Sequence, residues 1–354
     1  MTDRKWYWIV GIGGIVFVGL LWLRRRHQQG FGFVEEEHPS LQKIVGNSTA
    51  IKNLKERIKR FAAVDGPVLI EGETGTGKEL VADAIIALSN RRDKPSVKVN
   101  MAAIPESLLM SELFGHVKGA FSGAVSARSG LFKEFDGGTL VLDEIGEAPK
   151  QLQAALLRAV EQGEIKPVGA EQTQKVNVRI IASTNRSLAN EVNYGNFRED
   201  LYQRLQALNI KVPPLRERMD DVRPLALAFA KKMAHDQGKK LKWSEAGIAK
   251  LQNYNWRRGN VRELRNVIEQ AIAFTDSGQN LDDNVVIPTP KALPQTLEER
   301  VAECEREVLR EALAAGSYEE AAQRLGISVP TLWRKRKQHN LEGVAQCFTR
   351  HCDL

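Results

Sequence analysis

Between positions 72 and 79 the sequence has the residue types of a phosphate-binding loop. An apolar run, Val68–Ile70, comes directly before the loop and predicts a buried strand, and the apolar spacing after it predicts a helix. When a strand, a glycine-rich turn and a helix follow one another, the backbone N–H groups of the turn can close around a polyphosphate, and Lys78 can reach the terminal phosphates. A plain glycine turn is the alternative, but a lysine at this spacing disfavours it. We expect ATP or GTP to be held by Gly72, Glu73, Thr74, Gly75, Thr76, Gly77, Lys78 and Glu79.

A pair of acidic residues, Asp143 and Glu144, ends a second apolar run that starts at Thr139. Ligands of parallel sheets bind at the carboxyl ends of the strands, so both carboxylates would face the nucleotide. We expect Asp143 to hold Mg²⁺ and Glu144 to polarise the water that attacks the γ-phosphate. Glu79 stands where phosphate-binding loops commonly have a Ser or Thr ligand for magnesium, and Asp143 together with the phosphates can supply that contact.

Hydrolysis also requires positive charge on the far side of the γ-phosphate. Arg198 and Arg204 are candidates for this role. The alternative is a solvated helix face on which both arginines pair with Glu199 and Asp200. Spacing alone favours that alternative.

The elements that position these residues can be predicted from hydrophobic periodicity. From Val45 onward, strand-like runs alternate with helical stretches. Ser48 can cap the first helix, because apolar residues follow it at helical spacing. The alternation predicts an α/β fold with a parallel five-stranded sheet and helices on both faces. After Pro213 the pattern is helical and without strands up to about Asp276. The expected strands are Val68–Glu71, Val97–Asn100, Thr139–Leu142, Val178–Ser183 and Leu208–Val212.

The chain has 354 residues, which is the length of roughly two or three domains. Hydrophobic residues make up 42% of it, as in globular proteins. A formal net charge of +7 and a sequence pI near 9.2 favour a polyanionic partner, either nucleic acid or a membrane surface. The three cysteines, Cys304, Cys347 and Cys352, do not suggest a disulfide framework, which fits a reducing compartment. Cys347 and Cys352 could form a metal or redox pair, although an unstructured tail is favoured.

The run from Trp6 to Leu23 is uncharged and mostly apolar, and basic residues flank it on both sides. At ~1.5 Å per residue it reaches roughly 27 Å, which is enough to cross a hydrocarbon core. A cleavable signal peptide is the alternative, but arginines follow the run where a small-residue cleavage site would be needed. We expect a single transmembrane anchor in the inner (cytoplasmic) membrane, with the nucleotide-binding domain and the rest of the chain in the cytoplasm.

Near the C-terminus, two short helices are predicted on either side of Gly326, with Ser317 and Ser328 as their caps. Two helices joined by a glycine turn are typical of a helix-turn-helix. The second helix is strongly basic, and a solvated basic helix is the alternative. Residues near the start of a recognition helix meet base edges, so we expect DNA contacts from Thr331, Arg334 and Lys335.

The stretch from Ile44 to about Phe274 resembles the AAA+ domain of bacterial enhancer-binding proteins, the activators of RNA polymerase that carries sigma-54. The most specific likeness is Gly119–Ala124, read as GAFSGA, which is similar to the GAFTGA loop of that family. The ELFGH run at Glu112–His116 and the loop at 72–79, including Glu79, also follow the family pattern. The C-terminal module resembles the Fis-type DNA-binding domain that ends these activators.

The resemblance implies roles for individual residues. Phe121 and Ser122 would form the tip of the mobile loop that contacts the sigma factor. Asn100 would couple the catalytic glutamate to that loop, and Asn185 would be the polar sensor beside the γ-phosphate. Arg262 would be the second sensor, in the helical lid.

The resemblance also implies that Arg198 and Arg204 are finger arginines, supplied to the nucleotide of a neighbouring subunit. Arginines that act in a neighbouring subunit require a ring, and the family assembles as a hexamer. Two positions depart from the family: Ser122 lacks the methyl group of threonine, and Trp256–Asn260 lacks a proline and has one added residue. Proline would fix the backbone there, so the departure bears on where Arg262 lies.

Together these patterns predict a membrane-anchored, sigma-54-dependent transcriptional activator that uses ATP and Mg²⁺ and binds DNA and the sigma-54 polymerase. A membrane AAA+ unfoldase and a membrane-bound DNA-binding repressor with a regulatory nucleotide site are the alternatives. The expected divisions are an anchor at 1–27, a linker at 28–43, the α/β ATPase at 44–213, a helical lid at 214–286, a linker at 287–295, the helix-turn-helix at 296–341 and a tail at 342–354.

Overall fold

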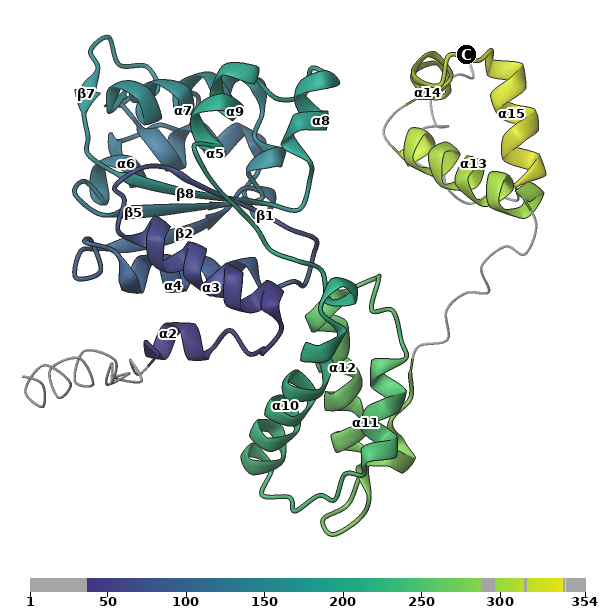
Figure 1. The fold of residues 1–354 in the computed structure, drawn as a ribbon. Coiled ribbons are helices and arrows are strands. Elements are labelled where there is room, and N and C mark those ends of the chain that lie inside the picture. Colours follow the sequence, from purple (N-terminus) through teal and green to yellow (C-terminus); the bar gives the residue numbers. More distant parts are fainter. Residues whose placement is uncertain (1–36, 288–296, 315–316, 340, 342–354) are drawn as a thin grey trace, which may run out of the picture. The chain divides into compact units, whose positions relative to one another are not determined.

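The computed structural model describes residues 37–287, 297–314, 317–339 and 341. They belong to two compact units, which divide between Val285 and Val286, and each unit has its own hydrophobic core (Figure 1). In the described ranges no helix is long and apolar enough to span a bilayer. The expected anchor, Trp6–Leu23, lies outside those ranges, as do the expected tail and most of the expected linker after the lid.

The first unit is built around a five-stranded sheet with the strand order β2-β5-β8-β1-β9, and every pairing in it is parallel. The predicted fold class is confirmed, and the strand ends differ from the expected ones by at most one residue. Every residue of β8 is buried because this strand lies in the middle of the sheet. The strands are β1 (Val68–Glu71), β2 (Ser96–Asn100), β5 (Thr139–Asp143), β8 (Arg179–Thr184) and β9 (Leu208–Lys211).

Helices cover both faces of this sheet (Figure 1). Side chains of a strand alternate between faces, so Leu69 belongs to one core and its neighbours Val68 and Ile70 to the other. One core contains side chains of α2 (Pro39–Gln42), α3 (Thr49–Ala62) and α4 (Lys78–Leu88). The other contains side chains of α5 (Glu106–Phe114), α6 (Leu131–Glu134), α7 (Lys150–Gln162), α8 (Leu188–Asn193) and α9 (Glu199–Leu205).

Two short antiparallel hairpins and two single-turn helices extend from this layered core. One hairpin, β3 with β4, carries the GAFSGA residues in its loop. The elements are β3 (Gly115–His116), β4 (Arg128–Ser129), β6 (Glu164–Ile165), β7 (Gln174–Lys175) and the 3₁₀ turns η1 (Met101–Ala103) and η2 (Ile145–Glu147).

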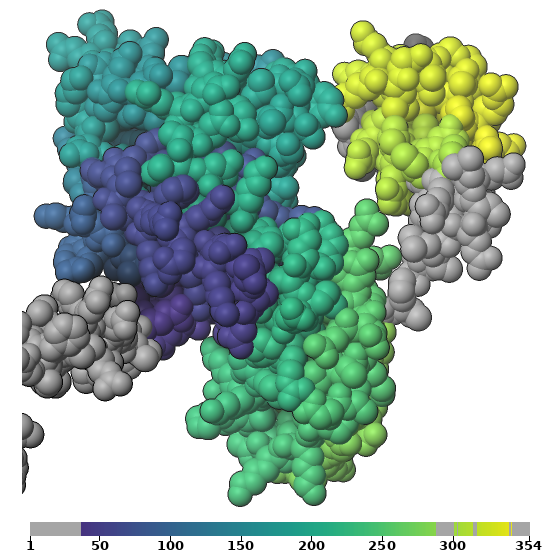
Figure 2. Space-filling model, in the orientation of Figure 1, coloured from purple at the N-terminus to yellow at the C-terminus, as the bar shows by residue number. Residues whose placement is uncertain are grey.

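After β9 the chain is helical, as expected, and forms a lid around α10 (Val222–Asp236), α11 (Glu245–Gln252) and α12 (Asn260–Ala273). Its largest buried side chain is Trp256, whose Nε1 donates to the Leu251 carbonyl at 2.9 Å. In Figure 2 the green surface of the lid adjoins the purple surface of the α3 region. The lid also contains the 3₁₀ turns η3 (Leu215–Glu217), η4 (Met219–Asp221) and η5 (Leu281–Asn284).

The second unit consists of α13 (Leu297–Ala314), α14 (Tyr318–Arg324) and α15 (Val329–Gln338). Ser317 and Glu320 form a reciprocal capping box at the start of α14, and Ser328 caps α15, as the sequence predicts. Gly326 has φ +64° in the turn between them, where a left-handed residue is needed. The unit is therefore a helical module with a helix-turn-helix at its end.

Candidate nucleotide-binding site

The loop between β1 and α4 has the backbone of a phosphate cradle. Gly75 and Gly77 have φ of +78° and +104°, values that side-chain-bearing residues rarely adopt. Gly77 precedes α4 directly, so the free N–H groups of that helix point at the loop. A Cβ atom on Gly75 would lie 2.1 Å from the Gly259 carbonyl oxygen of the lid. Glycine at 75 is therefore required for the approach of the lid as well as for the turn.

The Lys78 ammonium is nearly buried and donates to the Gly72 carbonyl at 2.8 Å, across the loop. Burial lowers the pKa of Lys78, and the nearby carboxylates of Glu144 and Asp143 oppose this shift, whereas Arg262 adds to it. Lys78, both acidic residues and Arg262 are thus electrostatic neighbours. The structure therefore brings together, at this loop, four of the charged residues that the sequence analysis assigns to the nucleotide.

Asp143 is the last residue of β5 and Glu144 follows it, and the two carboxylates lie in different environments. The Asp143 carboxylate accepts a hydrogen bond from Ser183 Oγ at 2.6 Å. Glu144 has φ +54°, a left-handed conformation that is strained for glutamate, and its Oε2 accepts from the Asn185 N–H at 3.2 Å. Strain of this kind is held in place by the surrounding structure and concentrates at functional sites. It aims the Glu144 carboxylate toward the end of β8.

Asn185, the predicted polar sensor, and Asn100, the residue predicted to couple the catalytic glutamate to the GAFSGA loop, lie at different places. Asn185 Nδ2 donates to Thr74 Oγ1 at 3.2 Å, which connects the end of β8 to the phosphate loop. Asn100 pairs in register with Asp143 at the end of β2, and its side-chain oxygen accepts from the Ala102 N–H at 2.9 Å. The expected coupling runs from Asn100 to Glu144, whereas in this structure the Glu144 carboxylate bonds to Asn185.

A magnesium ion would find only part of its ligand set here. In the described ranges no three His, Cys, Asp or Glu side chains form a group that could hold a metal. Glu79 points elsewhere, to Lys98 of β2 at 3.0 Å. Hard cations accept carboxylate and phosphate oxygens together, so the residues present fit Mg²⁺ held by Asp143 and the phosphates of a bound nucleotide.

The lid contacts the phosphate loop through residues that the sequence analysis did not single out. Arg216 of η3 donates from both terminal nitrogens to the Glu73 carboxylate, at 2.7 Å each. Hydrogen bonding from Arg216 holds the pKa of the Glu73 carboxyl below its usual value. Asn260 Nδ2 donates to Glu73 Oε2 and to the Thr74 carbonyl, both at 3.1 Å. Nothing in sequence spacing indicates these pairs, because their partners lie far apart in the chain.

The unusual turn before α12 still delivers Arg262 to the site. Trp256 and Asn260 both have φ +52°, and the Asn260 N–H donates to the Trp256 carbonyl at 3.0 Å. The turn from Trp256 to Asn260, which has one residue more than the family pattern, is therefore closed by this hydrogen bond. The Arg262 N–H donates to the Gly75 carbonyl at 3.3 Å, which fixes the first turn of α12 against the loop.

The predicted finger arginines lie on or beside α9, at the surface. Arg198 pairs with Asp200 at 2.6 Å, and Arg204 approaches Glu161 of α7 at 3.8 Å. The backbone N–H of Arg198 donates to the side-chain oxygen of the buried Gln153 at 2.8 Å, and this bond fixes the backbone position of Arg198 at the start of α9. These pairings partly match the solvated-face alternative, in which Asp200 was an expected partner. Both guanidinium groups remain accessible to another molecule.

The GAFSGA residues form a compact tip on the β3–β4 hairpin. Phe121 is 44% exposed, and its ring meets the His116 ring edge to face with centroids 5.1 Å apart. Ser122 is exposed beside it. His116 is itself fixed by Ser111 at 2.7 Å and by the Ser126 carbonyl at 3.1 Å. An apolar side chain is therefore presented to solvent on a loop with a defined base.

The basic residues of α15 lie in two different environments. Arg334 is exposed, while Lys335 pairs with Glu305 of α13, which also bonds to His339 at 2.9 Å. Thr331 Oγ1 shares a hydrogen bond with Ser328 Oγ at 2.8 Å. Trp333, which the sequence analysis passed over, is 58% exposed next to Arg334. The outward face of α15 thus combines an indole with a guanidinium, and Lys335 helps to join α15 to α13.

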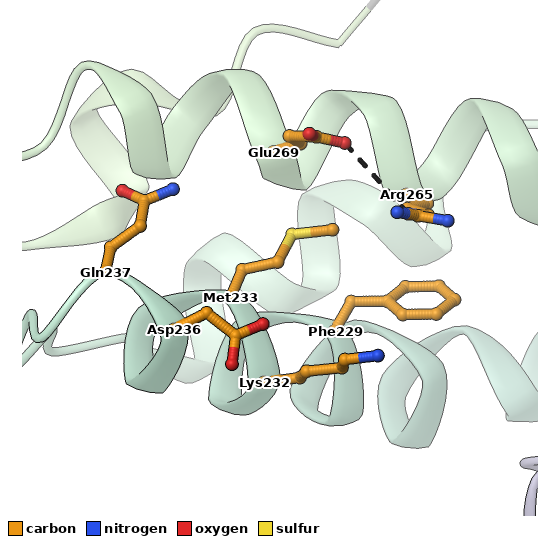
Figure 3. A pocket seen from close by; sticks show the side chains of 7 residues that line it. All are labelled: Phe229, Lys232, Met233, Asp236, Gln237, Arg265 and Glu269. Atoms are coloured by element: carbon orange, nitrogen blue, oxygen red, sulfur yellow. Dashed lines mark ion pairs between the residues drawn. The ribbon is translucent and has the colours of Figure 1, made fainter.

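A separate pocket of about 340 Å³ lies on the lid between α10 and α12 (Figure 3). Phe229 and Met233 contribute its apolar part, and Arg265 and Glu269 face each other at 4.0 Å along its rim. No residue predicted from the sequence for the nucleotide, the sigma factor or DNA lines it. The remaining lining residues are Lys232, Asp236 and Gln237.

Three family descriptions match consecutive parts of the chain. Residues 44–211 match the sigma-54 interaction domain, residues 216–307 the AAA+ ATPase lid domain, and residues 300–339 the bacterial regulatory proteins of the Fis family. The first two matches span the phosphate loop, the acidic pair, the GAFSGA hairpin and Arg262. The third spans most of the helical second unit.

Curated relatives and solved structures agree with these matches. The chain is 49% identical over 258 residues to the Nif-specific regulatory protein of Klebsiella pneumoniae, covering 72% of this chain and 49% of the relative. It is 45% identical over 300 residues to the transcriptional regulatory protein ZraR of Escherichia coli O157:H7, covering 82% of this chain and 68% of that protein. The chain therefore spans about half the length of the first of these relatives.

Among solved structures, NtrX from Brucella abortus in complex with ATP has a TM-score of 0.63 and 32% identity, covering 84% of this chain and 69% of that one. A further structure of NtrX covers 92% of this chain and 74% of its own, with the same TM-score and 31% identity. The chain belongs to the sigma-54 interaction family of AAA+ ATPases, in which the ATPase domain is followed by a helical lid and a Fis-type DNA-binding domain.

Proposed function

We propose that this ATPase activates transcription by RNA polymerase that carries sigma-54, and that it uses ATP hydrolysis to remodel the closed promoter complex. The observation that carries the proposal is the hairpin tip with Phe121. A large apolar side chain, half exposed on a short supported loop, is suited to binding another protein. The GAFSGA residues of this tip fall inside the matched sigma-54 interaction domain.

The mechanism starts at the nucleotide. The loop at 72–79 binds the phosphates of ATP, and Lys78 turns from the Gly72 carbonyl to the terminal phosphates. Glu144 accepts a proton from the attacking water, and Asn185 holds both Glu144 and Thr74 in register with the γ-phosphate. Mg²⁺, when bound through Asp143, supplies neutralising charge on the phosphates. Loss of the γ-phosphate changes the contact between Glu144 and Asn185. This change reaches Asn100, which lies at the same carboxyl end of the sheet, and from there it alters the position of the GAFSGA hairpin.

The active form is a ring, of six subunits by analogy with the family. Arg198 and Arg204 lie on the surface, where they can reach a neighbour's γ-phosphate. Their local carboxylates, Asp200 and Glu161, release them when the neighbour's nucleotide offers a stronger anion. Arg262 acts on the nucleotide of its own subunit, because the start of α12 is bonded to the phosphate loop.

The second unit holds the ring at an upstream DNA site through the exposed face of α15. The run Trp6–Leu23 tethers the assembly to the cytoplasmic membrane, and the ATPase and DNA-binding units work on the cytoplasmic side. The support for the tether is the apolar run and its flanking arginines alone. Fractionation of cells that express the full chain and a chain without residues 1–30 tests it: the full chain should sediment with membranes, and the shortened chain should not.

Transcription in vitro tests the proposed function itself. With sigma-54 polymerase and a sigma-54 promoter, the full chain should yield transcripts with ATP and none with a non-hydrolysable ATP analogue. Polymerase carrying another sigma factor is the control and should be insensitive to the chain. Equal transcription with both nucleotides, or none with either while ATP is hydrolysed, would rule the proposal out.

A further inference from the structure

The phosphate loop is bonded to the lid at four consecutive residues. Arg216 binds the Glu73 carboxylate with both terminal nitrogens, and Arg262 donates its N–H to the Gly75 carbonyl. Arg218, nearly buried, donates to the Thr76 carbonyl at 3.0 Å. The fourth attachment, at Thr74, is made by Asn260. The loop that must close on a polyphosphate therefore cannot move without moving lid residues.

Asn260 is the centre of these attachments. Its Oδ1 accepts from the Leu215 N–H at 2.8 Å, and its Nδ2 donates to Glu73 Oε2 and to the Thr74 carbonyl at 3.1 Å. One amide thus joins the phosphate loop, the first lid turn η3 and the start of α12. The side chain is 1% exposed, so water does not compete for these bonds.

The backbone at Asn260 is strained to make this possible. Its φ of +52° is left-handed, a conformation that asparagine tolerates better than most residues but that glycine adopts without cost. Glycine at this position would relieve the backbone and lose all three side-chain bonds. The presence of asparagine in a buried left-handed position indicates that the amide itself is needed.

We propose that Asn260 is a positioning residue for the ATPase: its amide couples closure of the phosphate loop to the seating of the lid, and so fixes Arg262 at the nucleotide. Arg262 lies two residues further along the same helix, and its backbone is bonded to Gly75. Because Glu73 is shared by Asn260 and Arg216, binding of phosphates in the loop is transmitted to both entry points of the lid, η3 and α12. This role of Asn260 concerns nucleotide binding by the ATPase domain and does not depend on the sigma factor.

Nucleotide affinity of the full chain tests this coupling. Replacing Asn260 by Ala removes three hydrogen bonds, and we expect a fluorescent ADP analogue to bind roughly tenfold or more weakly, since bonds to charged or buried groups contribute at this level. KM for ATP should rise more than kcat falls, because Glu144 and its partners are untouched. Val267→Ala is the matched control: it creates a cavity in the same helix without contacting the phosphate loop.

The control separates positioning from simple loss of stability. Both variants should lower the unfolding temperature, but only Asn260→Ala should weaken binding of the fluorescent ADP analogue and reduce the rise in unfolding temperature that ADP produces. If Val267→Ala weakens nucleotide binding as much as Asn260→Ala at an equal loss of stability, the proposal is wrong. It is also wrong if Asn260→Ala binds the analogue as tightly as the unmodified chain.

An exchange of polar groups gives a second, independent test. Asn260→Asp places a carboxylate against Glu73 and the Thr74 carbonyl, and should weaken nucleotide binding at least as much as Asn260→Ala. Adding Glu73→Gln restores a donor–acceptor pair between positions 73 and 260 and the original net charge. The double variant should recover part of the affinity that Asn260→Asp loses. Additive losses in the double variant would contradict a direct coupling between the two side chains.

Discussion

In the proposed mechanism hydrolysis depends on Glu144, whose left-handed backbone orients its side chain. The φ of +54° and the bond to the Asn185 N–H hold the carboxylate at the junction of β5 and β8. The sequence predicts the acidic pair and the strand, because alternation and apolar runs are local signals. It does not predict the left-handed backbone, which only the packed structure imposes.

Replacing Glu144 by Gln should leave nucleotide binding intact and lower ATP turnover by about 10²-fold or more, since the general base is lost. Turnover and binding of a fluorescent ATP analogue are measured on the same preparation. Glu147→Gln, in the turn directly after, removes a carboxylate that pairs with Arg186 and should retain turnover. Equal turnover by Glu144→Gln and the unmodified chain would exclude Glu144 as the base.

Which side chains of α15 are free to contact DNA could not be predicted from the sequence, because it depends on pairing with residues of other helices. The sequence assigns Lys335 to DNA, but its ammonium pairs with Glu305, a residue on another helix. It assigns no role to Trp333, which is 58% exposed. In this unit the core position next to it is taken by Leu332, so the indole faces outward.

At the scale of elements, the structure attaches the lid to the α/β layers through a buried carboxylate. Asp221, 0% exposed at the start of α10, accepts from the Asn47 N–H at 2.6 Å, the Ser48 N–H at 2.8 Å and Ser48 Oγ at 2.6 Å. The strands and helices themselves were predictable from periodicity. This attachment was not, because its two sides are separated by most of the domain.

Asp221→Ala should lower the free energy of unfolding by about 3 kcal/mol, because buried N–H groups lose their acceptor. Chemical denaturation followed by circular dichroism measures the change. The neighbouring exposed Asp220 provides the control, since Asp220→Ala should change stability by no more than about 0.5 kcal/mol. Similar losses in both variants would show that the buried contacts do not carry the attachment.

Helix α15 should read DNA through both an apolar and a charged side chain. Arg334→Ala should weaken DNA binding and reduce the salt slope, d log K/d log[salt], by about one, because one phosphate-neutralising charge is lost. Trp333→Ala should weaken binding with the salt slope unchanged. Duplexes selected by the full chain from a random pool serve as probes, and Lys232→Met on the lid is the charge control. An unchanged affinity in Trp333→Ala would place the indole outside the interface.

The α13–α15 contact should depend on pH. Hydrogen bonds from Lys335 and His339 lower the pKa of the Glu305 carboxyl. A lowered folded-state pKa means that the ionised group stabilises the unit above the unfolded pKa, about 4.3, and that this stabilisation is lost as pH falls through the folded pKa. Hydrogen exchange of α15, corrected for intrinsic rates, should therefore not change with pH above about 5 and should speed up as the pH falls below about 4.3.

Glu305→Gln should remove much of that pH dependence, while Glu307→Gln, at an exposed position of the same helix, should retain it. Exchange in α15 that changes with pH to the same extent in both variants would mean that other carboxylates determine the acid response.

At the scale of the whole molecule, the proposed ring requires copies of the chain to share a nucleotide site. Each chain has a complete phosphate loop and acidic pair, while Arg198 and Arg204 lie at its surface. The family resemblance, carried by the GAFSGA and ELFGH runs, gave the ring and the finger role. Composition and periodicity could not have supplied either one, because both concern contacts with another molecule.

Mixing two inactive variants tests the shared site. Arg204→Ala has an intact acidic pair and Glu144→Gln has intact arginines, so a site is complete when the first supplies the acidic pair and the second supplies the arginine. If sites act independently, an equal mixture should regain about a quarter of the ATP turnover. Each variant alone is the control. A mixture as inactive as its components would contradict arginines supplied by a neighbour.

The most direct test of the account measures ATP turnover and open-complex formation together for Phe121→Ala. The Phe121 ring packs on His116 in the β3–β4 hairpin. This variant should retain ATP turnover and form no open complex with sigma-54 polymerase, because the hairpin tip is the part that acts on the polymerase in the proposed mechanism. Open complexes formed at the rate of the unmodified chain would contradict it.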